Sequence, residues 1–268
     1  MSEIVLTIAG SDSGGGAGIQ ADLKTFSALG VYGASVITAV TAQNTRSVTA
    51  VHPIPVDVIA RQIEAVLCDL DVKAIKIGML ANCDVIDVVA DSLAGFNGHI
   101  VLDPVMIAKS GDTLLADDAV AHLLERLVPR ASLLTPNLPE AAHLLGTAQA
   151  NDAAQMQVQG EALLARGAKA VLMKGGHGTA DICTDIMFHL KHSPLRLTAP
   201  RLNTVNTHGT GCTLSSAITA GLGRGLDMAS AVTTAHAYLQ GAIKAADDLH
   251  VGSGHGPVHH FHELWNHG

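Results

Sequence analysis

Apolar runs and amphipathic segments alternate along the chain, with glycine-containing turns between them. Residues 3–9 form a β-branched apolar run typical of a buried strand, and a glycine-rich stretch at 10–18 follows it. Apolar side chains then recur at helical spacing over residues 19–29. The chain therefore opens with a strand, a loop and a helix.

The same alternation continues along the rest of the chain. Expected strands span 72–79, 99–102, 131–134 and 168–173, with paired edge strands at 182–190 and 195–199; expected helices include 55–70, 84–93, 117–127, 152–166 and 228–249. Strands that alternate with helices predict a largely parallel sheet covered by helices. We expect an α/β fold in a single domain, 1–268.

Composition restricts the possible partners and compartment. Hydrophobic residues make up 48% of the chain and aromatic residues only 3%, which suits a parallel-sheet core built from Ala, Val, Leu and Ile. A formal net charge of −8 argues against a nucleic-acid partner. The four cysteines are widely spaced, the N-terminus shows no signal-peptide pattern, and no apolar run is long enough to span a bilayer. We expect a cytoplasmic protein with free thiols.

The glycine-rich loop resembles two nucleotide-binding motifs without satisfying either. A P-loop needs a lysine directly after its glycines, but Lys24 already lies inside the expected helix. A Gly-x-Gly-x-x-Ala sequence at 16–21 fits the dinucleotide pattern, but no acidic residue stands between Asp22 and Asp57 to bind the ribose. A dinucleotide oxidoreductase is therefore rejected. The loop is instead expected to let a small substrate lie against the backbone at the end of the first strand.

A second polar turn, at residues 207–211, runs directly into Cys212 and an apolar helical pattern. The first N–H groups of such a helix are free, and its dipole adds partial positive charge, so it can hold a phosphoryl group. Gly209 and Gly211 lack Cβ atoms and permit close approach to the backbone. The alternative is a plain capped helix start.

Polar residues follow several of the expected strands. Asp103 is a Mg²⁺ candidate or a turn-forming Asp before proline. Asn137 and Glu140 stand in capping-box register, and Glu140 could also act through a Mg²⁺-bound water. Lys174 precedes two glycines and could reach an ATP phosphate. These positions predict a site at one edge of the sheet.

Gln43 and Asp22 are the candidates near the first strand. The Gln43 amide can both donate and accept, which suits an aminopyrimidine-like edge, or it takes part in turn chemistry with Asn44. Asp22 lies in the first turns of the expected helix, where its carboxylate could bind substrate or could complement the positive end of the helix dipole. The histidine-rich segment 255–267 lacks the ligand spacing of a metal site.

Several stretches together resemble a known enzyme family: GSDSGGGAGIQADLKTF, TAVTAQNT, KIGML, LDPVMIAKSGD, LLTPNLPEA, LMKGGH, NTHGTGCTLSSAI and GPVHHFH. In this order, and over essentially the whole chain, they are similar to the bacterial hydroxymethylpyrimidine and phosphomethylpyrimidine kinases of the ribokinase-like superfamily. The resemblance implies a three-layer α/β/α fold with about nine strands. It also implies ATP·Mg²⁺-dependent phosphorylation of the pyrimidine's hydroxymethyl group, then of the monophosphate, for thiamine synthesis, usually in a homodimer.

By position, the resemblance implies four sets of site residues. They are Gln43, Asp22, Gly10, Met79 and Val105 for the substrate; Lys174, Thr207 and Asn137 for ATP; Asp103 and Glu140 for Mg²⁺; and Gly209, Thr210, Gly211 and Cys212 for catalysis. The resemblance places Cys212 where sugar kinases carry an aspartate base. Separately, the sequence predicts an exposed loop at Lys109-Ser110-Gly111, which is a candidate for closing over the substrate.

A cysteine in that position is chemically acceptable. Phosphoryl transfer passes through a loose transition state, so charge stabilisation matters more than a strong base. A helix N-terminus is expected to lower the pKa of Cys212 from the free value of about 8.5. The second acceptor is a phosphate and needs no base. The alternative is that Cys212 is a small packing residue.

Two rival functions share this fold. A pyridoxal or pyridoxine kinase is the nearer one, because some superfamily members with a cysteine at this position accept vitamin B6 compounds. A catalytically silent ligand-binding protein is disfavoured because Lys174, Glu140 and the Gly-Thr-Gly-Cys turn are all present.

Overall fold

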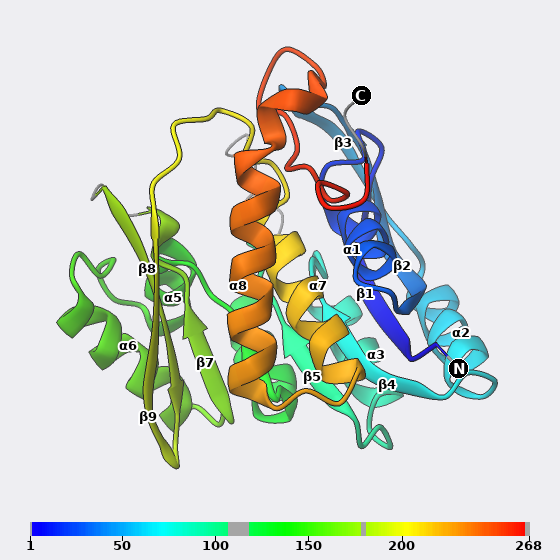
Figure 1. The fold of residues 1–268 in the computed structure, drawn as a ribbon. Helices are drawn as coiled ribbons and strands as arrows, with labels where there is room; N and C mark the ends of the chain where they lie inside the picture. Colours follow the sequence, from blue (N-terminus) through cyan, green and yellow to red (C-terminus); the bar gives the residue numbers. More distant parts are fainter. Residues whose placement is uncertain (1, 107–117, 178–180, 266–268) are drawn as a thin grey trace.

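Nine strands of one sheet run through the part of the chain that the computed structural model describes, residues 2–106, 118–177 and 181–265 (Figure 1). The strand order is β3-β2-β1-β4-β5-β6-β7-β8-β9. The strands are β1 (Ile4–Asp12), β2 (Tyr32–Gln43), β3 (Val48–Pro53), β4 (Val72–Ile77), β5 (His99–Leu102), β6 (Leu133–Leu134), β7 (Ala170–Met173), β8 (Ile182–His189) and β9 (His192–Pro200).

The middle of the sheet is parallel and its margins are antiparallel. β1 pairs in parallel with both β2 and β4, and parallel pairing continues through β5 and β6 to β7. β3 pairs antiparallel with β2, while β8 and β9 continue antiparallel from β7. The carboxyl ends of the six parallel strands therefore lie along one edge, where open α/β sheets bind their ligands.

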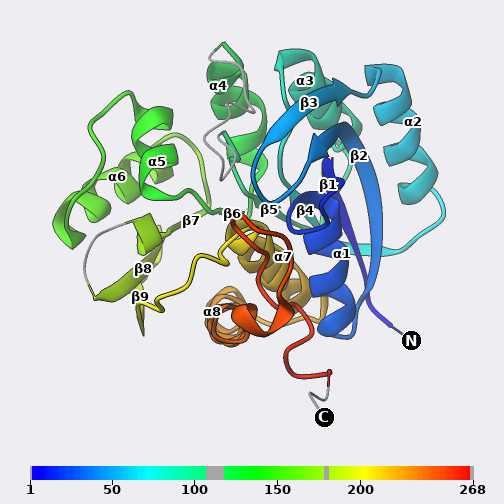
Figure 2. The same cartoon turned by 90° about the horizontal axis from the view of Figure 1, so that it is seen from above.

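Helices cover both faces of the sheet (Figure 2). One apolar cluster joins the sheet to the face formed by α2, α3, α5 and α6, and a second joins it to α1, α7 and α8. The helices are α1 (Gly18–Ala28), α2 (Val56–Leu67), α3 (Cys83–Ser92), α4 (Ala119–His122), α5 (Leu138–Leu145), α6 (Ala153–Ala165), α7 (Thr210–Gly223) and α8 (Met228–Lys244). The predicted three-layer α/β/α fold is confirmed.

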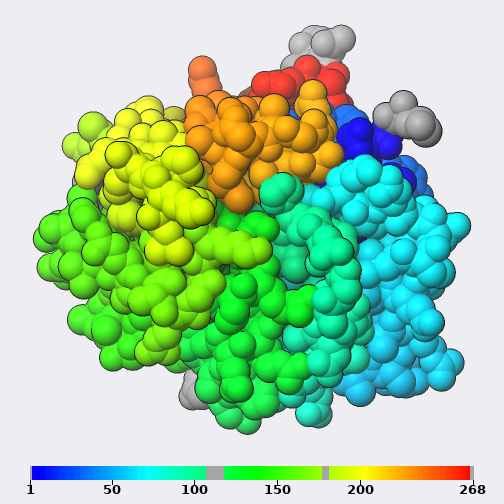
Figure 3. Space-filling view, turned by 90° about the horizontal axis from the view of Figure 1, so that it is seen from below, coloured from blue at the N-terminus to red at the C-terminus, as the bar shows by residue number. Residues whose placement is uncertain are grey.

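Successive residues of the central strands face opposite layers. Leu6 and Ile8 of β1 belong to one cluster, whereas Val5 belongs to the other. α7 packs closely because its residue Gly223 has no side chain: a Cβ there would lie 2.5 Å from Val5 Cγ1. Small and branched residues thus replace aromatic bulk in the core. Figure 3 shows the molecule from below, where segments from the first half of the chain (cyan and green) lie beside segments from its last third (yellow and orange).

Some expected elements differ in extent. β6 has only two residues, and the helix expected over 228–249 ends at Lys244, followed by a 3₁₀ turn at Ala246–Leu249. The helix expected over 117–127 is α4 followed by a π-helical turn at Leu123–Leu127. The unpredicted β3 is exposed at nearly every position, so no apolar alternation marks it.

The strands of the sheet come from residues 4–200, and α7 and α8 complete its second face. This arrangement supports a single domain over 1–268, which stays a prediction. Among the residues described, no helix combines the length and hydropathy that a bilayer span requires.

Candidate active site

The loop before α7 touches the glycine-rich loop after β1. Gly209 is the N-cap of α7 and has a φ of +79°, a left-handed conformation that favours glycine. A Cβ on Gly209 would lie only 1.9 Å from the carbonyl oxygen of Gly16. The predicted anion-holding turn therefore lies directly against the end of β1, and only a glycine permits the contact.

A charged cluster lies beside the first turn of α7. Lys174 Nζ is 2.8 Å from Asp103 Oδ1 and 3.9 Å from Glu140 Oε2. Thr135 also donates a hydrogen bond to Asp103 Oδ1, at 3.0 Å. A Cβ on Gly211 would lie 3.3 Å from Lys174 Nζ and 3.5 Å from Asp103 Oδ2. The helix N-terminus, one ammonium and two carboxylates thus meet at one place.

Burial and charge set the protonation of this cluster. Burial alone would raise the pKa of Asp103, but the ammonium groups of Lys174 and Lys76 hold it below the usual value. Burial likewise opposes the charged form of Lys174, but the neighbouring carboxylates raise its pKa. Burial raises the pKa of Glu140 to about 7, because Lys174 compensates it only in part. Near neutral pH the cluster therefore holds one firm ion pair and one half-protonated carboxyl group.

Glu140 also caps α5. The backbone N–H of Asn137 donates a hydrogen bond to Glu140 Oε2 at 2.7 Å, and the backbone N–H of Glu140 donates one to Asn137 Oδ1 at 2.8 Å. The capping box is therefore present, as one of the two interpretations predicted. The roles of Asn137 toward ATP and of Glu140 toward Mg²⁺ stay predictions.

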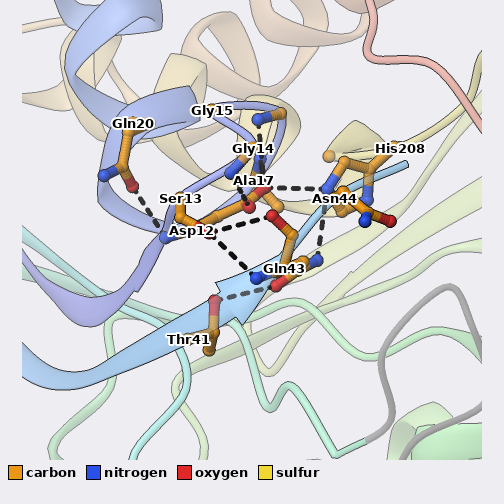
Figure 4. A network of polar contacts seen from close by, with 12 residues as sticks. Asp12, Ser13, Gly14, Gly15, Ala17, Gln20, Thr41, Gln43, Asn44 and His208 are labelled. Atoms are coloured by element: carbon orange, nitrogen blue, oxygen red, sulfur yellow. Dashed lines mark hydrogen bonds and ion pairs between the residues drawn. The ribbon is translucent and has the colours of Figure 1, made fainter. Parts of the chain in front are cut away.

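The glycine-rich loop is organised by a residue that the sequence analysis did not select. The Asp12 carboxylate accepts hydrogen bonds from the amides of Gly14, Gly16 and Ala17 at 2.8–3.0 Å (Figure 4). Burial alone would raise the pKa of Asp12, but the hydrogen bonds from His208 and these amides have the larger effect, so the pKa lies below its usual value. The amides that we expected to face a substrate therefore hold Asp12 instead. An acidic residue at the start of a glycine-rich loop was the available signal.

Gln43 lies at this same junction. Its Nε2 is 3.4 Å from His208 Nε2, and its Oε1 is 3.1 Å from the Thr41 hydroxyl (Figure 4). His208 Nε2 is in turn 2.9 Å from Asp12 Oδ2. Because His208 directly precedes Gly209, the structure brings the predicted substrate-reading amide and the predicted phosphoryl-binding turn together.

Asp22 does not lie in an open pocket. It is fully buried, and its oxygens accept hydrogen bonds from Thr7 at 2.6 Å, Ser216 at 2.6 Å and Lys76 at 2.9–3.0 Å. These partners satisfy the carboxylate within the protein. In the structure Asp22 therefore has a role inside the core, and its expected part in orienting the substrate stays a prediction.

The other expected pocket residues stand near the end of β1. Gly10 is packed against Met79, since a Cβ on Gly10 would lie 2.4 Å from Met79 Cε. Met79 is buried and Val105 is half-buried. Their contacts with substrate stay predictions.

Cys212 is a partly exposed residue of the first turn of α7. The Gly18 amide donates a hydrogen bond to it, and Lys76 favours its ionised form. Burial is nevertheless the largest effect, and it raises the pKa of the Cys212 thiol to about 11. The expectation that the helix N-terminus lowers this pKa is wrong for the ligand-free protein.

The remaining candidates are placed less decisively. The Thr207 carbonyl accepts a hydrogen bond from the Thr210 amide at 3.4 Å, so Thr207 closes the turn before α7. The expected roles of Thr207 in ATP binding and of Thr210 in catalysis stay predictions. Lys109-Ser110-Gly111 lies outside the described residues. The described residues contain no group of three His, Cys, Asp or Glu side chains that could hold a metal ion.

Comparisons with known proteins identify the family of the chain. A family model described as phosphomethylpyrimidine kinase matches residues 12–259. The chain belongs to this family. The hydroxymethylpyrimidine/phosphomethylpyrimidine kinase of Rhizobium meliloti (strain 1021) is 58% identical over 265 residues, which cover 99% of each chain.

Solved structures show the same fold. The ADP complex of Bacillus subtilis pyridoxal kinase has a TM-score of 0.91 and 34% identity, covering 99% of this chain and 100% of that one. The phosphomethylpyrimidine kinase of Clostridium difficile 630 has a TM-score of 0.78 and 44% identity, covering 90% and 99%. These findings confirm the predicted family and fold and the prediction that this chain is a kinase.

Proposed function

We propose that the chain transfers a phosphoryl group from ATP to the hydroxymethyl group of 4-amino-5-hydroxymethyl-2-methylpyrimidine. A second transfer to the monophosphate then gives the diphosphate used in thiamine biosynthesis. The names of the most similar relatives support both steps. One observation supports the location: Gly211, in the first turn of α7, faces Lys174 and Asp103 across the space that a Cβ would fill.

The first turn of α7 and Lys174 would stabilise the charge that develops on the transferring group. Free amides at a helix N-terminus are oriented donors, and a lysine is a mobile point charge. Because phosphoryl transfer has a loose transition state, such positioning and charge stabilisation supply most of the acceleration. The absence of a side chain on Gly211 leaves room for the phosphate oxygens beside the ammonium group.

Asp103 and Glu140 fit a Mg²⁺ ion bound together with nucleotide phosphates. Mg²⁺ is usually held by one or two carboxylates, with phosphates and waters completing the shell. Both buried carboxyl groups lie near Lys174, and burial, which that ammonium group offsets only in part, raises the pKa of Glu140 to about 7. A divalent cation would supply the missing positive charge, neutralise phosphate oxygens and favour the ionised form of Glu140.

Cys212 would act on the acceptor side. A thiol whose pKa is about 11 is neutral at pH 7 and is not a ready base. It is available as a hydrogen-bond partner for the substrate hydroxyl at the mouth of α7. The phosphate acceptor of the second step is already anionic and depends less on such a partner.

Pyridoxal phosphorylation is the second candidate, because pyridoxal kinases share this fold at TM-scores near 0.9. ATP consumption should be measured with hydroxymethylpyrimidine, its monophosphate, pyridoxal and ribose. We expect turnover with the first two. Turnover with pyridoxal or ribose alone would contradict the assignment. A cytoplasmic homodimer remains part of the proposal, and light scattering of the purified chain tests the dimer.

A further inference from the structure

The orientation of the Gln43 amide is fixed by groups on both sides of it. The Ser13 hydroxyl accepts a hydrogen bond from the backbone N–H of Gln43 and donates one to its backbone carbonyl, both at 2.9 Å, which holds the main chain of Gln43. At the side chain, Thr41 lies at one end and His208 at the other (Figure 4). The two ends of a glutamine amide have the same shape, so its hydrogen-bond partners decide which end is oxygen.

Asp12 determines the proton on His208. The Asp12 carboxylate already accepts hydrogen bonds from backbone N–H groups. When it is ionised it has no hydrogen to donate and acts as an acceptor alone. His208 Nε2 lies 2.9 Å from Asp12 Oδ2, and this contact is favourable only if Nε2 carries a hydrogen. His208 Nε2 is therefore a donor, in either the neutral or the charged ring.

Because His208 Nε2 gives its single hydrogen to Asp12, it cannot accept a hydrogen bond, and a carbonyl is the favourable group of Gln43 to face it. If the amide nitrogen faced His208 Nε2 at 3.4 Å, two donors would oppose each other. Thr41 points the same way, because its single hydroxyl hydrogen can be given to the Ser11 carbonyl, 3.0 Å away. The hydroxyl oxygen can then accept from the Gln43 amide nitrogen. Among these groups, the Gln43 side-chain nitrogen finds an acceptor only when it faces Thr41 and the side-chain carbonyl faces His208.

This orientation leaves one acceptor and one donor of Gln43 for a ligand. The free lone pair lies on the His208 side and the free N–H lies on the Thr41 side. A 4-aminopyrimidine offers the complementary edge, with the amino hydrogen beside the ring-nitrogen lone pair. The amino group would face the His208 end, and the adjacent 5-hydroxymethyl group would then point toward the residue that follows His208, the N-cap Gly209.

We propose that His208, held by Asp12, is a positioning residue that turns the Gln43 carbonyl toward α7 and thereby sets which way round the aminopyrimidine binds. The inference rests on the proposed function. If the Gln43 side-chain amide had the opposite orientation, the pyrimidine ring would bind turned over. The hydroxymethyl group of the substrate would then point away from the phosphoryl-binding turn.

The test compares two acceptors, 4-amino-5-hydroxymethyl-2-methylpyrimidine and its analogue that lacks the 4-amino group. For His208→Phe, which removes the Nε2 hydrogen, we expect the ratio of kcat/KM values for the two acceptors to fall about tenfold, roughly the effect of one hydrogen bond. The loss should lie mainly in the KM of the aminopyrimidine. His208→Gln places an amide donor at a similar reach and should restore most of the ratio.

Two further variants serve as controls. Thr41→Val removes the partner at the other end of the amide and should also lower the ratio. His99→Phe changes an exposed histidine at the start of β5 and should leave it unchanged. If His208→Phe does not fold, as judged by its thermal unfolding, His208→Gln and Thr41→Val decide the question.

The outcomes separate the two proposals. Equal losses for both acceptors in His208→Phe and Thr41→Val would show a purely structural role and overturn this inference. A wild-type enzyme that uses both acceptors equally well would also overturn it, because the amide edge would then not be read. A wild-type enzyme that uses neither acceptor would contradict the proposed function itself.

Discussion

Lys76 Nζ lies 2.9 Å from Asp22 Oδ2, and neither side chain is exposed to solvent. Lys76 stands on β4 and Asp22 on α1, while Thr7 of β1 and Ser216 of α7 donate to the same carboxylate. Burial opposes the charge on Lys76, yet Asp22 and neighbouring charges raise its pKa above the ordinary value. This pair joins β4, α1, β1 and α7, the last through Ser216 in the second turn of the helix.

Asp22→Asn should strongly destabilise the protein. The substitution keeps the shape of the side chain but leaves the Lys76 charge buried without its partner, a loss of about 3–5 kcal/mol in the free energy of unfolding. Urea unfolding measures it. Arg61→Ala, which breaks an exposed pair with Asp57, should have little effect. A similar small effect for Asp22→Asn would contradict the buried pair.

Cys212→Ala should damage the first phosphorylation more than the second. The first acceptor is a neutral hydroxyl that benefits from a partner at the mouth of α7, whereas the second is an anionic phosphate. We expect kcat/KM for the first step to fall by about tenfold or more. Separate assays with hydroxymethylpyrimidine and its monophosphate measure this. Equal losses in both steps would indicate that Cys212 only packs.

The Cys212 thiol should react slowly with iodoacetamide in the ligand-free protein. With a pKa of about 11, only roughly a thousandth of it is thiolate at pH 8. The alkylation rate, followed by mass spectrometry, should rise about tenfold per pH unit up to pH 10. Exposed Cys68 serves as the internal comparison. If Cys212 reacted as fast as Cys68 at pH 7.5, its pKa would not be raised.

Glu140→Gln should change the dependence of stability on pH. The pKa of Glu140 rises from 4.5 to about 7 on folding, so between these values the folded state binds more protons than the unfolded one. The contribution of Glu140 to the free energy of unfolding is therefore most favourable below pH 4.5. It is lost, by about 3 kcal/mol, as the pH rises toward 7.

Glutamine preserves the capping box but cannot titrate. Thermal unfolding of both proteins across pH 4.5–8 measures the difference between them. If that difference stays constant over this range, the raised pKa of Glu140 is contradicted.

Gly211→Ala should affect catalysis far more than folding. Its methyl group would enter the space beside Lys174 Nζ, and we expect kcat to fall roughly tenfold to hundredfold with a nearly unchanged melting temperature. Gly209→Ala should instead destabilise the protein, because its Cβ would clash with Gly16. Gly146→Ala is the matched control, with a similar positive φ but open space around it. Equal stability losses at 209 and 146 would contradict the loop contact.

The fold could be predicted from sequence because its strands and helices carry local periodicity. β3 could not, because it is exposed at nearly every position and pairs with β2 at the edge of the sheet. The strand-end candidates Asp103 and Lys174 also follow from local position, since parallel strands end at one edge. Their separation of 71 residues still becomes a contact only in the folded sheet.

The missed residues depend on partners far along the chain. Asp12 and His208 are 196 residues apart, and the sequence gives no sign that they meet. Lys76 did carry a signal, because a lysine inside a buried apolar run requires a buried counter-charge. The resemblance assigned Asp22 to the substrate, and sequence reasoning did not pair it with this lysine.

The contact between Gly209 and Gly16 has a consequence for biosynthesis of the enzyme. Backbone from the first tenth of the chain completes its site only against backbone from the last quarter. Such distant pairing is slow to form during folding. A ribosome-bound chain that has emerged only as far as β9 has the strands of the sheet and Lys174 but lacks the turn before α7, so the proposed phosphoryl-binding site is complete only after α7 has been made.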